Sequence, residues 1–232
     1  SKASFTEKSI SKEREIIQQE IGMYQDSPDY RLFFGALENL YPGTPLADDI
    51  AGTRESISDI TIDNLRENFD LFYHPSQMHL LVIGNFDVDE VLQVVKKYDL
   101  TSPRPSVELE RFPVEKNEVR LNQSCRMEVV TPKLAIGIRG NDIIKEEEKF
   151  RYKLMLKLLF SMMFGWTSQR FQSLYEAGKI DNSLTLEVEV EELFHFVILT
   201  MDTQEPVSLS HQFRSAIKQF EKDPDVNQEH LD

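Results

Sequence analysis

Apolar residues recur at helical spacing over roughly the first hundred positions of the chain. A first helix is predicted from about Thr6, whose hydroxyl can cap the free backbone amides, to about Tyr24. Two further helical stretches are predicted at 30–41 and 61–73, and the polar residues between them predict a long loop. The beginning of the chain is therefore expected to be largely helical.

The helical pattern is interrupted by one short apolar run, 79–86, which is bounded by turn-forming residues and predicts a buried strand. Asp87 is expected to cap the next helix, and Lys96 and Lys97 lie where the dipole of that helix favours cations. The following stretch, 101–118, is rich in proline and charge, which is typical of a linker.

Beyond this linker the alternation of short apolar runs and helical stretches begins again. Strands are predicted at 124–130, 133–140, 183–192 and 194–202, and helices at 146–164 and 168–178. Gly178 is the expected C-cap of the second of these helices, and a last helix opens at Pro206 and Ser208. The pattern predicts an α+β fold of two tandem units.

The domain boundaries follow from the linker. Residues 1–100 are expected to be the C-terminal part of a first α+β domain, 101–118 a linker, and 119–232 the N-terminal part of a second domain. Neither unit completes its layers, and the first residues lack the apolar core of a signal peptide. We therefore expect the chain to be an internal fragment.

Composition narrows the classes of function. The net charge of −14 argues against a nucleic-acid partner, because phosphate binding needs a basic surface, and it disfavours anionic membranes. No apolar run is long enough for a membrane span. Cys125 is the single cysteine, which excludes a disulfide framework or a thiolate metal cluster and fits a reducing compartment such as the cytoplasm.

The histidines and Cys125 offer no complete catalytic site. The 5 histidines have no metal-ligand spacing, and neither HExxH nor HxxEH occurs. Cap, surface or satisfied strand positions are expected for them: His74, His79, His195, His211 and His230. Cys125 has no histidine near it in the sequence and is expected to be a buried or half-exposed strand residue. Glycine-rich phosphate loops and the GxSxG nucleophile motif are also missing.

Glu13 and Glu20 are the remaining candidates, because they fall inside the apolar stripe of the first helix. That stripe consists of Ile16, Ile17, Ile21 and Tyr24. The two carboxylates lie two turns apart, about 10.5 Å along the axis. A buried carboxylate needs a cation, a metal or a donor network. The alternative is that Glu13 stays solvated at the helix start and Glu20 pairs with an arginine, and periodicity favours that alternative because ion pairs outnumber metal sites.

The same helix resembles a known family. Residues 12–31, KEREIIQQEIGMYQDSPDYR, are similar to the glutamate helix of the insulinase/pitrilysin zinc metallopeptidases, the inverzincins with HxxEH. The likeness continues through 41–87 in its PG.PL, G(T/S).E.I and G(N/D).D motifs. Residues 132–140 and 165–180 resemble the opening of the second domain of that family, with its SxR(L/F) helix. Within the family, the bacterial zinc proteases of about twice this length are most similar.

The resemblance implies two α/β-sandwich units of the LuxS/processing-peptidase-like type and a zinc endopeptidase as the intact protein. Carried over position by position, Glu20 is a zinc ligand and Glu13 supports the ligands or the substrate. The two histidines of HxxEH would complete the site, and this chain lacks them. The chain alone is therefore expected to hold no zinc and to be inactive.

The expected partners also come from the resemblance. They are a peptide or small-protein substrate and a second subunit, in a homodimer or in a heterodimer with a related chain. The family also contains inactive members, so the alternative function is a non-catalytic subunit that binds a peptide or a partner.

Overall fold

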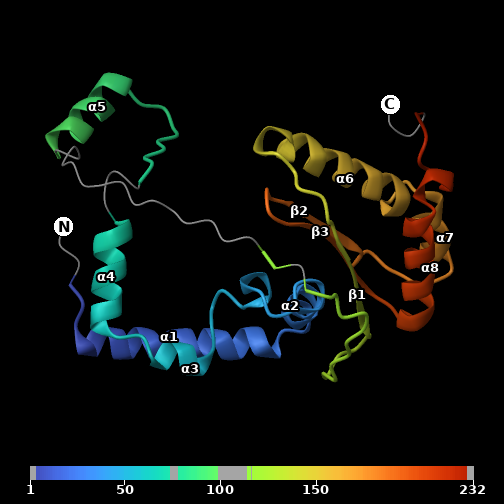
Figure 1. Ribbon diagram of the computed structural model, residues 1–232, viewed down its shortest axis with the longest axis horizontal. Coiled ribbons are helices and arrows are strands. Elements are labelled where there is room, and N and C mark those ends of the chain that lie inside the picture. Colours follow the sequence, from blue (N-terminus) through green and yellow to red (C-terminus); the bar gives the residue numbers. More distant parts are fainter. Residues whose placement is uncertain (1–3, 74–77, 99–113, 116, 229–232) are drawn as a thin grey trace. The chain divides into compact units, whose positions relative to one another are not determined.

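The computed structural model describes residues 4–73, 78–98, 114–115 and 117–228 of the chain (Figure 1). It divides into two compact units. The first consists of Ser1–Glu20 with Gly52–Phe112, and the second of Ile21–Ala51 with Pro113–Asp232. The mixed α and β composition expected from the sequence is confirmed. That the two units are structurally similar and lie in tandem stays a prediction, as do the domain ranges. Most of the expected linker lies outside the described residues.

The regular elements among the described residues of the first unit are all helices. Its elements are the first part of α1 (Glu7–Asp26), then α3 (Arg54–Ser58), α4 (Ile62–Phe72) and α5 (Val88–Lys97). The predicted caps are confirmed, since the Thr6 hydroxyl accepts from the Ser9 amide at 3.2 Å and the Asp87 carboxylate accepts from two amides of α5. Helix α3 was not predicted. It forms inside the expected loop because Thr53 and Ser56 make a reciprocal capping box.

Two predicted strands are wrong. Residues 79–86 form no strand, and their apolar side chains are exposed, Ile83 at 86%. Residues 124–130 form no strand either, and Cys125 is exposed where a buried or half-exposed position was expected. A strand requires a neighbour that accepts and donates its ladder hydrogen bonds, and no described segment pairs with either run.

The second unit is built on a three-stranded antiparallel sheet, and the remaining predicted strands are confirmed. Its strands are β1 (Lys133–Arg139), β2 (Thr185–Val190) and β3 (His195–Asp202), in the order β1-β3-β2. Strand β3 is therefore hydrogen-bonded on both edges. Its sequence, HFVILTMD, is a nearly continuous apolar run, as expected of a strand that is also covered on both faces.

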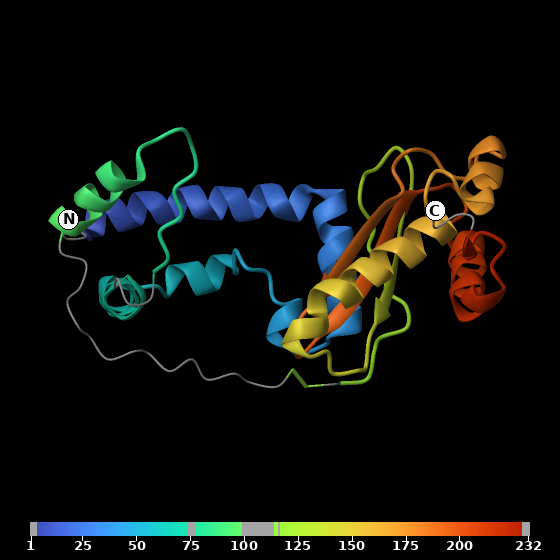
Figure 2. The same cartoon turned by 90° about the horizontal axis from the view of Figure 1, so that it is seen from above.

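The two faces of β3 supply two separate apolar clusters (Figures 1 and 2). Val197, Leu199 and Met201 pack with residues of α6 (Lys149–Phe164), α7 (Gln169–Glu176) and α8 (Pro206–Lys218). Phe196 and Ile198 point to the other face and pack against α2 (Pro28–Leu40). Alternation along one strand thus determines which helices cover each side of the sheet.

Helix α2 is fastened closely to this sheet. The Tyr41 hydroxyl donates to the carbonyl of His195 at 2.9 Å, and Arg139 Nη1 donates to the carbonyl of Leu40 at 2.8 Å. A Cβ atom on Gly137 of β1 would lie 2.9 Å from Leu40 Cδ1, so the glycine permits the close approach. Although α2 was assigned to the first predicted domain, it belongs to the second compact unit.

A buried ionic cluster holds the start of α7. Ser168 caps the helix by accepting from the Phe171 amide, and Asp225 accepts from the Gln169 amide at 2.7 Å. Arg170 Nη1 lies 2.7 Å from Asp223, whose side chain is 1% exposed. The Ser and Arg of the SxR(L/F) motif are thus structural residues in this unit, because they anchor the segment after α8 to α7.

Removing Arg170 should destabilise the second unit strongly, because Asp223 would keep a buried charge without its guanidinium. We expect Arg170→Ala to lower the free energy of unfolding by about 3 kcal/mol in urea titrations. Arg120→Ala is the control, since the Arg120–Glu38 pair is 55% and 45% exposed and should contribute less than about 1 kcal/mol. Equal losses in the two variants would contradict the buried cluster.

The Tyr41 phenol should make stability depend on alkaline pH. Burial raises the pKa of Tyr41 from 10.0 to about 12, although the Arg139 charge and the bond to His195 lower it. The folded chain therefore holds this proton more tightly than the unfolded chain, so the contribution is complete below pH ~10 and is lost as the pH rises towards 12. Between about pH 9 and pH 12, the free energy of unfolding should fall less in Tyr41→Phe than in the original chain. Urea unfolding at a series of pH values measures this difference.

Candidate functional site

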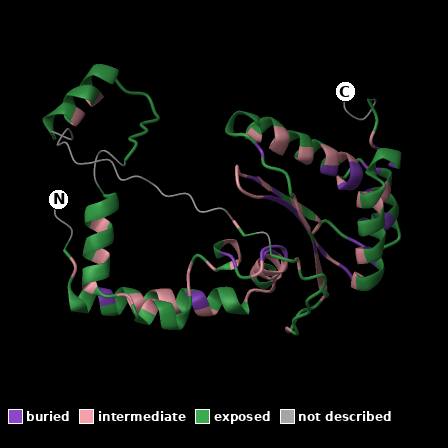
Figure 3. Ribbon diagram, viewed as in Figure 1, coloured by how far each residue is buried: buried purple, intermediate pink, exposed green. Residues whose placement is uncertain are grey.

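Glu13 and Glu20 lie on one face of α1, and the structure leaves both side chains exposed. Ile16 lies between them at 38% exposure, so these three residues form an open strip that we call the carboxylate face. The buried side of the helix is turned away from it, with Ile10 at 9% and Ile21 at 1%. Figure 3 shows the exposed residues that run along α1.

This exposure corrects the expectation that the two carboxylates occupy a core-facing stripe. The helix buries only one edge of that stripe, and the other edge faces solvent. The cost of desolvation that called for a compensating cation therefore does not arise within the described part of the chain. The alternative, a pair between Glu20 and an arginine, has no counterpart among the ion pairs of the described residues.

The opposite side of α1 is tied to the segment that contains α3. Arg14 Nε donates to the carbonyl of Ile57 at 3.3 Å, and its Nη2 donates to the carbonyl of Ile60 at 2.8 Å. One turn later, Gln18 Nε2 donates to the Ser58 hydroxyl at 3.1 Å. These bonds hold α1 with its carboxylate face outward within the first unit.

A complete metal site is not present among the described residues, where no group of three or more histidine, cysteine or acidic side chains converges. The donor chemistry of the carboxylate face nevertheless fits a partial site, because an exposed glutamate oxygen is an established zinc ligand. Glu20 therefore fits the role of one ligand, and a complete site would need further ligands from outside the described residues.

The described histidines agree with their expected structural roles. His79 and His211 are exposed, whereas His195 is buried in β3 with its ring edge-on to Tyr152 at 5.3 Å between centroids. A Cβ atom on Gly140 would lie 1.6 Å from His195 Nε2, so the imidazole occupies the space that a side chain at position 140 would need. His74 and His230 lie outside the described residues.

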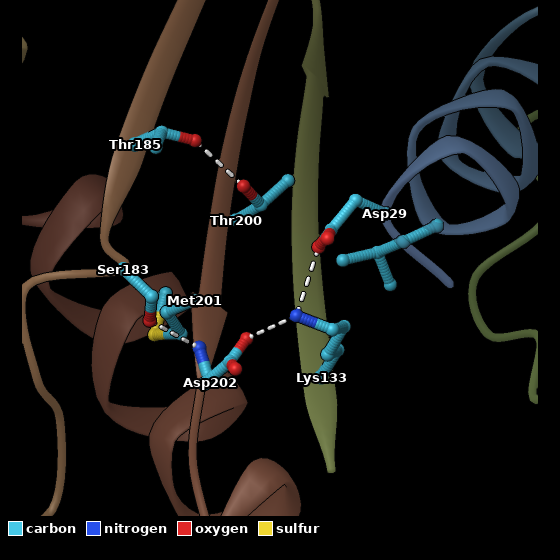
Figure 4. Close-up of a pocket in the computed structure, with 8 residues that line it drawn as sticks. Asp29, Lys133, Ser183, Thr185, Thr200, Met201 and Asp202 are labelled. Carbon is cyan, nitrogen blue, oxygen red and sulfur yellow. Dashed lines mark hydrogen bonds and ion pairs between the residues drawn. The ribbon is translucent and has the colours of Figure 1, made fainter. Parts of the chain in front are cut away.

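A second polar cluster, in the second unit, was missed by the sequence analysis (Figure 4). Lys133 Nζ lies 2.8 Å from Asp202 and 2.9 Å from Asp29, beside a cavity of about 320 Å³. The Thr185 and Thr200 hydroxyls are 2.6 Å apart, on the same cavity wall. Only the strand register, which puts Lys133 opposite Asp202, could have indicated this cluster.

Lys133, beside this cavity, takes part in ion pairs and cannot act as a catalytic base. Hydrogen bonds from Lys133 to Asp202, and then to Asp29, raise the pKa of the lysine against the opposing effect of burial. The ammonium therefore keeps its proton at neutral pH and has no free lone pair for general-base or nucleophilic chemistry. The cluster joins β1, β3 and α2 in the second unit.

The family assignment comes from comparison with known proteins. The model of the peptidase M16 inactive domain matches residues 59–232, which is more than half of the chain. The chain belongs to the M16 peptidase family. This confirms the resemblance to the insulinase-type zinc peptidases. The matched region begins after α1, so Glu13 and Glu20 lie outside it.

Individual M16 relatives support the assignment. The chain is 37% identical over 217 residues to a Bacillus subtilis protein named uncharacterized zinc protease YmfH, over 92% of this chain and 51% of that protein. A crystal structure described as M16-like, from Alicyclobacillus acidocaldarius, matches 98% of this chain and 54% of its own with a TM-score of 0.83 and 26% identity. A Helicobacter pylori protease shares the fold, with a TM-score of 0.80 at 16% identity over 98% of this chain and 56% of its own.

The chain thus spans about half the length of the M16 relatives it matches. Over the described residues, no helix has the length and apolar character that crossing a membrane requires.

The ion pairs of Lys133 generate a stability prediction. Replacing Lys133 with methionine should cost about 1–2 kcal/mol of unfolding free energy, because the partly buried carboxylate of Asp202 loses its cation. Adding Asp202→Asn should recover part of that loss. Lys179→Met is the control, since the Lys179–Glu205 pair is 34% and 44% exposed. Urea unfolding of Lys133→Met, Asp202→Asn, the double variant and Lys179→Met measures the coupling, and purely additive losses in the first three would argue against the ion pair.

Proposed function

We propose that the chain is part of a zinc-dependent endopeptidase in which Glu20 is one of the protein ligands of the metal and Glu13 supports the site. The observation that carries this proposal is the carboxylate face of α1, where both side chains are exposed, share one side of the helix and make no ion pair with another described residue. Support comes from membership in the M16 family and from the zinc protease relative that covers α1 as well.

Each carboxylate has a role that its position allows. Glu20 would hold the metal through a carboxylate oxygen, a donor that zinc accepts in proteins. Glu13, two turns earlier on the same face, would accept a hydrogen bond from a neighbouring ligand or from the substrate and so orient it. Zinc, when bound, supplies a Lewis acid that activates water for attack on a peptide carbonyl. The histidine ligands and the general base would come from the HxxEH helix of the intact protein.

A second candidate function is a non-catalytic subunit that binds a peptide or a related chain. The family model that matches residues 59–232 is described as an inactive domain, and this chain contains no HxxEH. In that case Glu13 and Glu20 would be solvated surface residues. The sequence that precedes Ser1 in the intact protein separates the two functions, because only the first requires HxxEH there.

The remaining parts of the proposal concern the intact protein. Its substrates would be peptides or small proteins, and it would act as a homodimer or as a heterodimer with a related subunit. The single free cysteine agrees with the cytoplasmic location that the proposal includes. The chain of residues 1–232 by itself should neither retain stoichiometric zinc nor cleave peptides, because one carboxylate ligand cannot hold the metal.

The test compares three glutamates of α1 in the intact protein. Glu20→Gln should lose bound zinc and peptide cleavage, and Glu13→Gln should weaken zinc binding by about 10- to 100-fold, as outer-shell changes do. Glu15→Gln is the matched control, because Glu15 is exposed on the same helix about 160° away from Glu13, at roughly 100° a residue. Zinc content by elemental analysis and cleavage of a quenched peptide are measured. Unchanged zinc and activity in Glu20→Gln would refute the proposal.

A further inference from the structure

Arg14 connects the helix that carries the carboxylate face to a separate segment of the first unit. Its guanidinium donates to two main-chain carbonyls, those of Ile57 and Ile60, at 3.3 Å and 2.8 Å. The first carbonyl lies in the last turn of α3, where it also accepts from the Ile60 amide at 3.4 Å, and the second lies just before α4. The planar guanidinium thus bridges two fixed acceptors from a half-buried position.

The direction of Arg14 on the helix determines where the carboxylates point. At roughly 100° a residue, Arg14 and Gln18 lie about 100° and 140° from Glu13, and Glu20 lies about 20° from Glu13 on the other side. The contact side of α1 is therefore turned about 130° away from the carboxylate face. Because α1 is held by its contact side, Glu13 and Glu20 face solvent.

We propose that Arg14 is a positioning residue, which fixes the rotation of α1 and thereby places the Glu20 carboxylate where zinc is bound. This inference rests on the proposed function, since it assumes that Glu20 is a zinc ligand. Two acceptors separated along the chain resist both rotation and sliding of the helix, which a single bond does not. The bond from Gln18 joins two side chains in an exposed position and offers less constraint.

The size of the effect follows from helix geometry. A side-chain end lies about 5–6 Å from the helix axis, so a rotation of about 30° moves a carboxylate by about 3 Å. Functional groups must stay within about 0.5 Å of their productive position. A modest loss of rotational restraint is therefore enough to weaken a metal ligand while the helix remains folded.

The experiment measures zinc affinity in the intact protein by competition with a chelator, at a temperature far below the unfolding midpoint. Arg14→Ala should weaken zinc binding by about 10- to 100-fold, the range found when groups that orient a ligand are removed. Arg14→Lys keeps the charge but has no planar fork to span both carbonyls, so it should recover only part of the affinity. Gln18→Ala should stay within about threefold of the original protein.

A control separates positioning from general destabilisation. Asp87→Ala removes the cap of α5 in the same unit, at 2.8 Å and 3.1 Å from two amides, without touching α1. It should lower the unfolding midpoint and leave zinc affinity unchanged. If Arg14→Ala does not fold, Arg14→Lys carries the test, because it retains a donor and the positive charge.

The outcomes distinguish this inference from the proposed function. If Glu20→Gln loses zinc and the Arg14 variants bind it as tightly as the original protein, Arg14 has no positioning role and the proposed function stands. If Glu20→Gln keeps zinc, the proposed function fails and this inference fails with it. If Asp87→Ala weakens zinc as much as Arg14→Ala does, the effect of Arg14 is structural and the inference is wrong.

Discussion

The burial of β3 on both faces is the constraint on which the second unit depends. A strand of eight residues, HFVILTMD, can be covered on both faces because each alternating set contributes apolar side chains, Val197, Leu199 and Met201 on one face and Phe196 and Ile198 on the other. Helices α6, α7 and α8 cover one set, and α2 covers the other. The position of α2 follows, because Phe196 and Ile198 would otherwise face water. Tyr41 and Arg139 then fasten the end of α2 to the strands.

Two carboxylates of the second unit, Asp223 and Asp202, differ in their surroundings from Glu13 and Glu20. Asp223 is withdrawn from solvent and is paired with Arg170, which is what a structural carboxylate requires. Asp202, partly buried, is likewise matched by Lys133. Glu13 and Glu20 are solvated, and no described cation is paired with either. The described fold therefore shows no ion pair that uses these two side chains, in contrast to Asp223 and Asp202.

The sequence predicted those features that depend on residues close together in the chain, above all the helix ends. Thr6, Asp87 and Gly178 mark helix ends correctly, because capping involves residues only a few positions apart. The runs at 79–86 and 124–130 were wrongly expected to be strands, because strand formation depends on a partner that sequence periodicity does not reveal. The five-residue helix α3 is too short for periodicity to show. The Lys133 cluster and the packing of α2 depend on register and tertiary contact, so they could not be anticipated.

The resemblance identified Glu13 and Glu20, and the structure changes the reason why they matter. They are not charges buried in a core but exposed carboxylates held outward by contacts on the opposite side of their helix. In water, such a carboxylate attracts a cation weakly, because the dielectric constant is high. If another part of the intact protein covers this face, as the proposed function requires, the same charge would act in a less polar environment and would bind a metal more strongly. Exposure of the carboxylate face is therefore compatible with the proposed zinc site, whose other ligands would lie on the covering part.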